Sequence, residues 1–157
     1  MPELPEVETI VRDLRPRLIG QVLKAPRLYQ TDVLYRVRPA QLLRALAGRR
    51  VVEVTRRAKH AVLRLNSGHR LVIQPGMTGA LLIYRRPLTE DERRYAVLTA
   101  QLSRNGTFVY RDVRRLGTIL LVNEAGWRAY SARIGPEPLD PDFDAGQLAA
   151  VLASTRQ

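Results

Sequence analysis

The chain has 157 residues, of which 45% are hydrophobic, and this is the size and apolar content of one globular domain with its own core. Its 26 Lys and Arg residues outnumber 15 Asp and Glu residues, and the net charge of +11 favours a polyanionic partner, nucleic acid before an anionic membrane surface. The sequence has no cysteine, which excludes disulfides and Cys-ligated metal centres within it, and its two histidines, His60 and His69, are too few to predict a metal site.

The first predicted element is a helix over residues 5–18. Apolar residues recur there at the spacing of one helical face: Val7, Ile10, Val11, Leu14 and Leu18. Pro5 suits a first helical turn because its missing N–H would have no partner there, and Glu6 and Glu8 complement the positive end of the helix dipole. Gly20 stands where a left-handed residue would end the helix. A second, shorter helix is predicted over residues 39–47.

From Arg50 onward the apolar period changes to two, which predicts strands. Seven segments have this character: VVEVT (51–55), AVLRL (61–65), RLVIQ (70–74), GALLIY (79–84), AVLTAQL (96–102), FVYRDV (108–113) and TILLV (118–122). The sequences NSG (66–68) and SRNG (103–106) are typical of hairpin turns. We predict an α+β fold that is mostly β, a two-layer β-sandwich of about eight short strands flanked by helices.

The last third of the chain ends in a different pattern. EAGWRAY (124–130) favours another helix, and IGPEPLDPDFD (134–144) has the proline content of a linker. Leu148, Val151 and Leu152 then begin a new apolar helical face. We therefore predict a domain over residues 1–134, followed over 135–157 by a linker and the start of a truncated, helical second domain.

No run approaches the roughly 18 apolar residues of a membrane-spanning helix, and the start lacks the basic-then-apolar pattern of a signal peptide. We therefore expect a cytoplasmic, nucleoid-associated monomer without membrane association.

The opening sequence MPELPEVE can carry chemistry as well as start a helix. An initiator methionine before proline is normally removed, which would leave Pro2 with a terminal secondary amine. Such an amine can attack an aldehyde-like carbon and form an iminium ion, as in Schiff-base catalysis. Glu3 and Glu6 lie on one side of the incipient helix and could donate a proton or steady a developing cation. If Met1 is retained, Pro2 is an amide and cannot be a nucleophile.

Four segments in order, MPELPEVET, GMTG, YRDVRRLGT and IGPEPL, resemble the amino-terminal domain of the bacterial formamidopyrimidine-DNA glycosylase family. The resemblance implies that Pro2 attacks C1′ of a flipped, oxidised purine nucleotide and that β- and δ-elimination then nick the strand. It also implies that Glu3 is the proton donor, Glu6 a supporting carboxylate and Lys59 a proton donor for elimination.

By the same resemblance, Met77, Arg115 and Leu116 match the positions that fill the void left by the flipped base and contact the orphaned base. Apolar or planar wedges are the usual choice for this task. The alternative interpretation makes Met77 a core residue and Arg114 and Arg115 an ordinary solvated pair. A methionine on the turn GMTG is better placed to protrude than to be buried.

The sequence departs from the family pattern in three places. Leu116 replaces the aromatic residue commonly found there, so it can wedge but cannot stack on a base. The stretch that often contains histidine reads RRYAVL, and Tyr95 or Arg94 would take over a DNA contact. The helix-two-turn-helix domain and the four-cysteine zinc finger, which supplies the family's δ-elimination arginine, are not in this sequence. No cofactor is therefore expected in this chain.

The leading hypothesis is the catalytic domain of a bifunctional DNA glycosylase and AP lyase that acts on double-stranded DNA containing 8-oxoguanine or formamidopyrimidines. An endonuclease VIII-like enzyme for oxidised pyrimidines is one alternative, although PELPE instead of that branch's typical PEGPE favours the purine hypothesis. A basic DNA-binding fragment without turnover is the second alternative.

Overall fold

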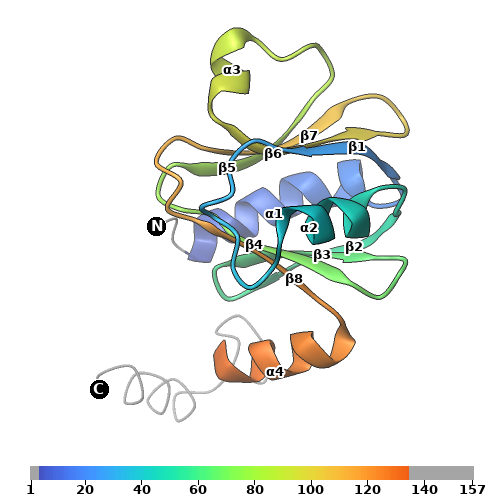
Figure 1. The fold of residues 1–157 in the computed structure, drawn as a ribbon, viewed down its shortest axis with the longest axis vertical. Coiled ribbons are helices and arrows are strands. Elements are labelled where there is room, and N and C mark those ends of the chain that lie inside the picture. The colour runs from blue at the N-terminus through green and yellow to red at the C-terminus, as the bar shows by residue number, and fades with distance from the viewer. Residues whose placement is uncertain (1–3, 135–157) are drawn as a thin grey trace.

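The computed structural model describes residues 4–134, which form eight strands and four helices. Two four-stranded antiparallel sheets face each other: an upper sheet in the order β1-β6-β7-β5 and a lower sheet in the order β2-β3-β4-β8 (Figure 1). The elements are α1 (Leu4–Leu18), β1 (Leu23–Leu28), α2 (Pro39–Leu46), β2 (Val51–Arg57), β3 (His60–Leu65), β4 (Arg70–Gln74), β5 (Gly79–Tyr84), α3 (Glu90–Arg94), β6 (Ala96–Leu102), β7 (Thr107–Asp112), β8 (Thr118–Val122) and α4 (Glu124–Ile134). The predicted mostly-β sandwich with flanking helices is confirmed.

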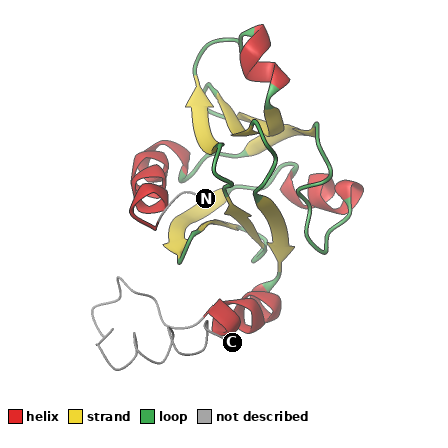
Figure 2. Ribbon diagram, turned by 90° about the vertical axis from the view of Figure 1, so that its left-hand side faces the viewer, coloured by secondary structure: helices red, strands yellow, loops and turns green. Residues whose placement is uncertain are grey.

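The core fills the space between the sheets, where alternate residues of each strand point inward. Leu63 and Ile73 of the lower sheet and Phe108 and Tyr110 of the upper sheet are at most 1% exposed and belong to one continuous apolar cluster. The helices α1 and α2 lie at opposite sides of the sandwich in the rotated view (Figure 2). They close its two open sides.

Helix α1 begins one residue before the predicted start and ends at the predicted residue. Four residues of its predicted apolar face, Val7, Val11, Leu14 and Leu18, are fully buried, and the fifth, Ile10, is half-buried. The helix packs against β2 and β3 of the lower sheet and against β5 of the upper sheet. The helix is thereby held against both layers of the fold.

Two elements were not predicted. Strand β1 contains Pro26 and a bulge between Lys24 and Arg27, and it pairs only with β6 at the edge of the upper sheet. An edge strand tolerates a proline, because one of its two sides has no neighbouring strand and the missing backbone N–H of proline is not needed there. Helix α3 is one short segment held by a capping box, in which Glu92 N–H donates to Thr89 Oγ1 and Thr89 N–H donates to Glu92 Oε1.

Helix α4 extends four residues beyond the predicted end and lies on the outer face of the lower sheet (Figure 1, orange). Trp127 and Tyr130 pack there against a small apolar cluster of Val62, Val72 and Leu120. The predicted linker over 134–144 and the apolar face of Leu148, Val151 and Leu152 lie outside the described residues apart from Ile134, which belongs to α4.

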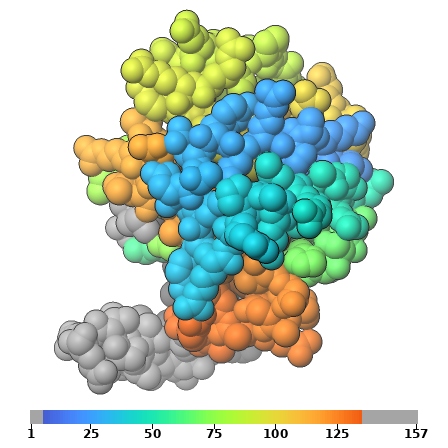
Figure 3. Space-filling model, viewed as in Figure 1, coloured from blue at the N-terminus to red at the C-terminus, as the bar shows by residue number. Residues whose placement is uncertain are grey.

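The segment between β1 and α2 covers the free edge of β8. Ile119 N–H donates to the carbonyl oxygen of Val33 at 2.8 Å, and Tyr35 N–H donates to that of Ile119 at 2.9 Å. Figure 3 shows this segment, in light blue to cyan, running down the face of the molecule beside the orange residues that precede β8. It therefore links the edges of the two sheets.

Within residues 4–134, none of the helices combines the length and the apolar character that crossing a membrane requires.

Candidate active site and nucleic-acid interface

Two loops cross between the sheets at the same end of the sandwich. The Met77 loop (residues 75–78) joins β4 to β5, and the Arg115 loop (residues 113–117) joins β7 to β8. Met77 is 63% exposed and Leu116 is 55% exposed, although both are large apolar residues. Met77 is therefore no core residue, and the two side chains form an apolar surface at the tips of adjoining loops.

The carboxylate of Asp112, at the end of β7, joins these two loops. Its Oδ1 accepts hydrogen bonds from Thr78 Oγ1 at 2.8 Å and from the Arg115 N–H at 3.0 Å. Its Oδ2 accepts from the Tyr110 hydroxyl at 2.8 Å and from the Gly117 N–H at 3.0 Å. Asp112 is 1% exposed, so these four donors take the place of water around a buried charge.

Burial by itself would raise the pKa of the Asp112 carboxyl. The hydrogen bonds from Thr78, from Tyr110 and from the two backbone N–H groups outweigh that effect and hold the pKa below its ordinary value. Burial and the bond to Asp112 raise the pKa of the Tyr110 hydroxyl, which stays a donor. The pair is therefore an anion and a neutral phenol at neutral pH.

Glycines allow the backbones of the two loops to touch. A Cβ on Gly117 would stand 2.1 Å from the Tyr110 hydroxyl oxygen and 2.5 Å from the Gln74 carbonyl oxygen. A Cβ on Gly76 would stand 2.7 Å from the Gly117 nitrogen. Real Cβ atoms do not approach so closely, so a side chain at either position would push the loops apart.

Arg115 is held at both its backbone and its side chain. Its φ of 54° lies in the left-handed region, which costs free energy for a residue other than glycine, and its N–H is bonded to Asp112. Its Nη1 donates to Gln30 Oε1 at 2.5 Å, and its Nε lies 3.4 Å from Asp32 Oδ2. Gln30 and Asp32 belong to the segment that covers the edge of β8.

The remaining predicted DNA-facing residues lie beside these loops. Arg114 is exposed, and its N–H donates to Thr78 Oγ1 at 3.0 Å. Tyr95 lines a cavity of about 210 Å³ together with Gln30, Val113 and Arg115. The structure thus brings together the five residues predicted to contact DNA: Met77, Tyr95, Arg114, Arg115 and Leu116.

The predicted catalytic residues fall into two groups. Pro2 and Glu3 lie outside the described residues, so their placement stays a prediction. Glu6 is exposed in the first turns of α1, and Lys59 lies half-buried in the tight turn between β2 and β3. This turn follows the pairing of Arg57 with His60, and Ala58 adopts a φ of 53° within it.

An ion pair ties the first turns of α1 to the strand that leads into the Lys59 turn. Arg56 Nε donates to Glu8 Oε2, and Arg56 Nη1 donates to the Ala58 carbonyl oxygen at 3.0 Å. The Arg56 side chain is only 5% exposed, and its hydrogen bond holds the pKa of Glu8 below the ordinary value. From the sequence, Glu8 was expected only to complement the helix dipole, and Arg56 had no expected function. The two residues are 48 positions apart in the chain, so no local sequence pattern indicates that they are in contact.

The other side of the Lys59 turn is anchored to α4. Arg57 Nε donates to Ser131 Oγ at 3.0 Å, and His60 Nε2 lies 2.9 Å from the Tyr130 hydroxyl oxygen. His60 Nδ1 lies 3.1 Å from the Arg57 carbonyl oxygen, which can only accept, so Nδ1 carries the proton and Nε2 accepts from Tyr130. Burial lowers the pKa of His60 and keeps the imidazole neutral.

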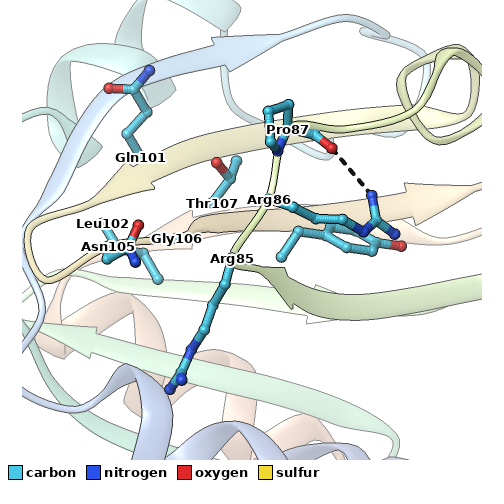
Figure 4. A pocket seen from close by; sticks show the side chains of 9 residues that line it. Arg85, Arg86, Pro87, Gln101, Leu102, Asn105, Gly106 and Thr107 are labelled. Carbon is cyan, nitrogen blue, oxygen red and sulfur yellow. Dashed lines mark hydrogen bonds between the residues drawn. The ribbon is translucent and has the colours of Figure 1, made fainter.

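A larger hollow of about 390 Å³ lies at the other end of β5 and β7, away from the two loops. Arg86 and Thr107 line it, and Arg86 is already engaged: it donates to the Pro87 carbonyl oxygen at 3.1 Å and to both carboxylate oxygens of Glu92 at 2.7 and 2.8 Å. In Figure 4 the Arg85 side chain extends away from Gln101 and Thr107. The arginine side chains around this hollow therefore do not converge to form a binding site for an anion.

Metal ligands are not grouped in the described part of the chain. Residues 4–134 contain no cluster of three or more His, Asp or Glu side chains that could hold a metal ion.

The comparisons with known proteins agree on one family. The family described as "Formamidopyrimidine-DNA glycosylase N-terminal domain" matches residues 1–119. The formamidopyrimidine-DNA glycosylase of Thermomicrobium roseum is 38% identical over 99% of this chain, and that of Caulobacter vibrioides is 35% identical over 100% of it. The chain spans 58% of the length of each of these relatives.

Solved structures give the same result. Lactococcus lactis Fpg in complex with DNA that contains an abasic site has a TM-score of 0.81 at 29% identity, over 91% of this chain and 53% of that one. The same enzyme in complex with FAPY-dG-containing DNA has a TM-score of 0.80 at 29% identity, over 90% of this chain and 53% of that one. From the family match over residues 1–119 and these similarities, the chain belongs to the formamidopyrimidine-DNA glycosylase family and carries its amino-terminal domain.

Proposed function

We propose that this chain is the catalytic part of a bifunctional DNA glycosylase and AP lyase that removes oxidised purines, 8-oxoguanine and formamidopyrimidines, from double-stranded DNA. One observation carries the proposal: two loops joined at Asp112 present exposed Met77, Arg115 and Leu116 at one end of the sandwich. Exposing two large apolar side chains to water is unfavourable, and their use in filling the gap left by an extruded base would explain why they are exposed there. The relatives' names and the DNA complexes of the Lactococcus lactis enzyme support the same function.

The proposed reaction begins at the amino terminus. The secondary amine of Pro2, exposed once Met1 is removed, attacks C1′ while the bond from C1′ to the base nitrogen breaks, and the proton that the amine loses goes to the departing base. Glu3 then protonates the ring oxygen as the sugar ring opens. The resulting iminium ion acidifies the C2′ hydrogen, so that the 3′-phosphate leaves by β-elimination and the 5′-phosphate by δ-elimination. Glu6 steadies the cationic intermediate, and Lys59 supplies a proton during elimination.

The DNA-facing residues act before the chemistry. Extruding the damaged nucleotide costs a few kcal/mol of stacking and pairing free energy. Met77 and Leu116 fill the space that the nucleotide leaves, and Arg115 donates to the orphaned base. Arg114 and Tyr95 contact the backbone or a neighbouring base at the edge of this site.

The charge of the chain supports a phosphate-rich partner. Arginines dominate the net charge of +11, and contacts to several phosphates release condensed counterions on binding. The affinity for duplex DNA should therefore fall steeply with salt, by about tenfold or more between 50 and 200 mM.

A DNA-binding fragment without turnover is the second candidate function, because the chain spans only 58% of the relatives' length. Incision of matched duplexes separates the two: a catalytic chain nicks DNA with 8-oxoguanine and leaves the undamaged duplex intact. We expect Arg115→Ala to impair incision at 8-oxoguanine more than covalent capture at an abasic site, which has no base to extrude. Salt-sensitive binding with no incision of either lesion or abasic DNA would favour the binding fragment.

A further inference from the structure

A buried histidine adjoins Lys59, although the proposed reaction assigns it no role. His60 is 7% exposed and follows Lys59 directly, at the start of β3. A polar side chain buried at this depth costs free energy unless its polar atoms are hydrogen-bonded. An apolar side chain would avoid that cost, so the stability of the core does not explain a histidine here.

The two ring nitrogens of His60 connect different parts of the fold. Nδ1 donates to the Arg57 carbonyl oxygen at 3.1 Å, and Nε2 accepts from the Tyr130 hydroxyl at 2.9 Å. Burial raises the pKa of the Tyr130 hydroxyl, which therefore stays protonated as a donor. The two rings also meet edge to face, with centroids 5.5 Å apart and an angle of 89° between their planes. Helix α4 thus fixes both the orientation and the tautomer of His60.

The turn that carries Lys59 needs support because its backbone is strained. Only two residues separate the paired Arg57 and His60, and one of them, Ala58, has a φ of 53° in the left-handed region. Arg57 provides a second connection to α4, since its Nε donates to Ser131 Oγ at 3.0 Å and its Nη2 donates to the Ser131 carbonyl oxygen at 3.1 Å. Both residues that flank the turn are therefore bound to adjacent residues of α4.

We propose that Tyr130 is a positioning residue for Lys59, because its hydrogen bond to His60 transmits the placement of α4 to the turn. A proton donor must come within hydrogen-bonding distance of the atom that it protonates, and a small displacement lowers the rate. Loss of the Tyr130 hydroxyl should therefore slow elimination without affecting imine formation at Pro2. The proposal rests on the proposed function only in that Lys59 supplies a proton during elimination.

Three substitutions separate the hydrogen bond from the packing of α4. Tyr130→Phe removes the hydroxyl and keeps the ring against the apolar cluster on the outer face of the lower sheet. Trp127→Phe reduces the packing of α4 on the same cluster and leaves the Tyr130 hydroxyl in place. Tyr35→Phe is the matched control: it removes the hydroxyl of a tyrosine that is 40% exposed and lines, together with Tyr130, a hollow of about 350 Å³.

The two lysines of the chain allow a measurement that needs no DNA. Lys59 is half-buried, whereas Lys24 is exposed in β1 of the upper sheet and serves as the internal reference. Each variant is treated with limiting acetic anhydride, and mass spectrometry gives the ratio of acetylated Lys59 to acetylated Lys24. We expect Tyr130→Phe to raise this ratio about two- to fivefold, the shift in a local opening equilibrium that follows the loss of one neutral hydrogen bond. Trp127→Phe and Tyr35→Phe should change it little.

Abasic-site DNA provides the second readout, because the lyase reaction has two stages. Borohydride capture reports the imine at Pro2, which precedes the step assigned to Lys59, whereas strand nicking reports elimination. Tyr130→Phe should nick about two- to fivefold more slowly, while its yield of captured imine at early times should equal that of the unsubstituted chain. A chain that is merely less stable would lose capture and nicking together.

An acetylation ratio in Tyr130→Phe that equals the ratio in Tyr35→Phe overturns the proposal. So does an equal rise in Trp127→Phe, which would assign the effect to the packing of α4, and so does a parallel loss of capture and nicking in Tyr130→Phe. If acetylation of Lys59 responds to Tyr130 as expected but the unsubstituted chain neither captures nor nicks abasic DNA, α4 still holds the turn and the proposed glycosylase and lyase function fails.

Discussion

Thr78 donates a hydrogen bond of 2.8 Å to the buried carboxylate of Asp112, and this contact joins the Met77 loop to the Arg115 loop. The two residues are 34 positions apart in the chain. The same Thr78 oxygen also accepts from the Arg114 N–H, so one hydroxyl bridges the two loops in both directions. Met77 and Leu116 are thereby fixed relative to each other before DNA is bound.

This bridge predicts a difference between two conservative changes of Thr78. Thr78→Val keeps the shape but removes the hydroxyl, and the loss of a hydrogen bond to a charged acceptor should cost about 1.5–3 kcal/mol of folding free energy. Thr78→Ser keeps the hydroxyl and should stay close to the unsubstituted chain. Urea unfolding measures the stability, and single-turnover incision of 8-oxoguanine duplexes measures the effect on base extrusion. Equal incision rates for the Val and Ser variants would show that the bridge does not position the loops.

Two glycine substitutions should have very different costs. Gly117→Ala forces a Cβ into contact with the Tyr110 hydroxyl and the Gln74 carbonyl, and we expect a loss of about 3 kcal/mol. Gly68→Ala, in the hairpin between β3 and β4, meets no atom within 4 Å and should cost only about 1 kcal/mol for its φ of 94°. Urea unfolding of both variants tests this ranking, which the reverse order would refute.

Glu8 binds two arginines, one buried and one exposed. Replacing each of them in turn gives a matched pair of variants. Arg56→Gln removes a partner that is 5% exposed, and should cost about 3 kcal/mol and slow β-elimination by displacing the Lys59 turn. Arg12→Gln removes a partner that is 72% exposed, and should change stability by at most about 0.5 kcal/mol. The rate of strand nicking at an abasic site is the readout. A similar rate in both variants would mean that Arg56 does not hold the turn in place.

His60 should make stability depend on pH near neutrality. Burial lowers its pKa in the folded chain below the ordinary 6.5, so between the two values the unfolded chain binds more protons. Stability should then rise with pH across this window and be lost as the pH falls below about 6.5. The pKa values of Glu8 and Asp112 are lowered from 4.5 and 3.8, so their contributions are lost only in more acidic solution.

The check is the free energy of unfolding at pH 7.5 and pH 5.5. His60→Gln, which cannot be protonated, should lose less stability between these two pH values than the unsubstituted chain. His69→Gln keeps His60 and should keep the full loss. An identical pH dependence in the chain with and without His60 would contradict the assignment.

The parts of the fold that depend on local pattern were predictable from the amino-acid sequence. The apolar spacing of α1 and the alternation in β2 to β8 were sufficient, because each reflects a face buried against one core. Strand β1 was missed because Pro26 and charged residues mask its alternation, and because its paired residues in β6 lie 70 or more positions away in the chain. The capping box of Thr89 and Glu92 was readable in the sequence but was not used to predict α3.

The candidate site was predictable only as separate motifs. GMTG and YRDVRRLGT indicated Met77, Arg115 and Leu116, but nothing local places Thr78 against Asp112 or Gln30 and Asp32 against Arg115. These contacts depend on strand order and on how the segment before α2 crosses the edge of β8. The ion pair of Glu8 with Arg56 is hidden for the same reason.

The most direct test of the account locates the covalent bond to DNA. The chain is incubated with abasic-site DNA and borohydride, and the reduced adduct is digested and mapped by mass spectrometry, with the intact mass first showing whether Met1 is removed. Three amines compete for the abasic sugar: the terminal amine and the side chains of Lys24 and Lys59, the two lysines of the sequence. We expect the deoxyribose remnant on Pro2 and a weak or absent adduct in Pro2→Gly. A remnant on Lys24 or Lys59, or an adduct of undiminished yield in Pro2→Gly, would contradict the proposed mechanism.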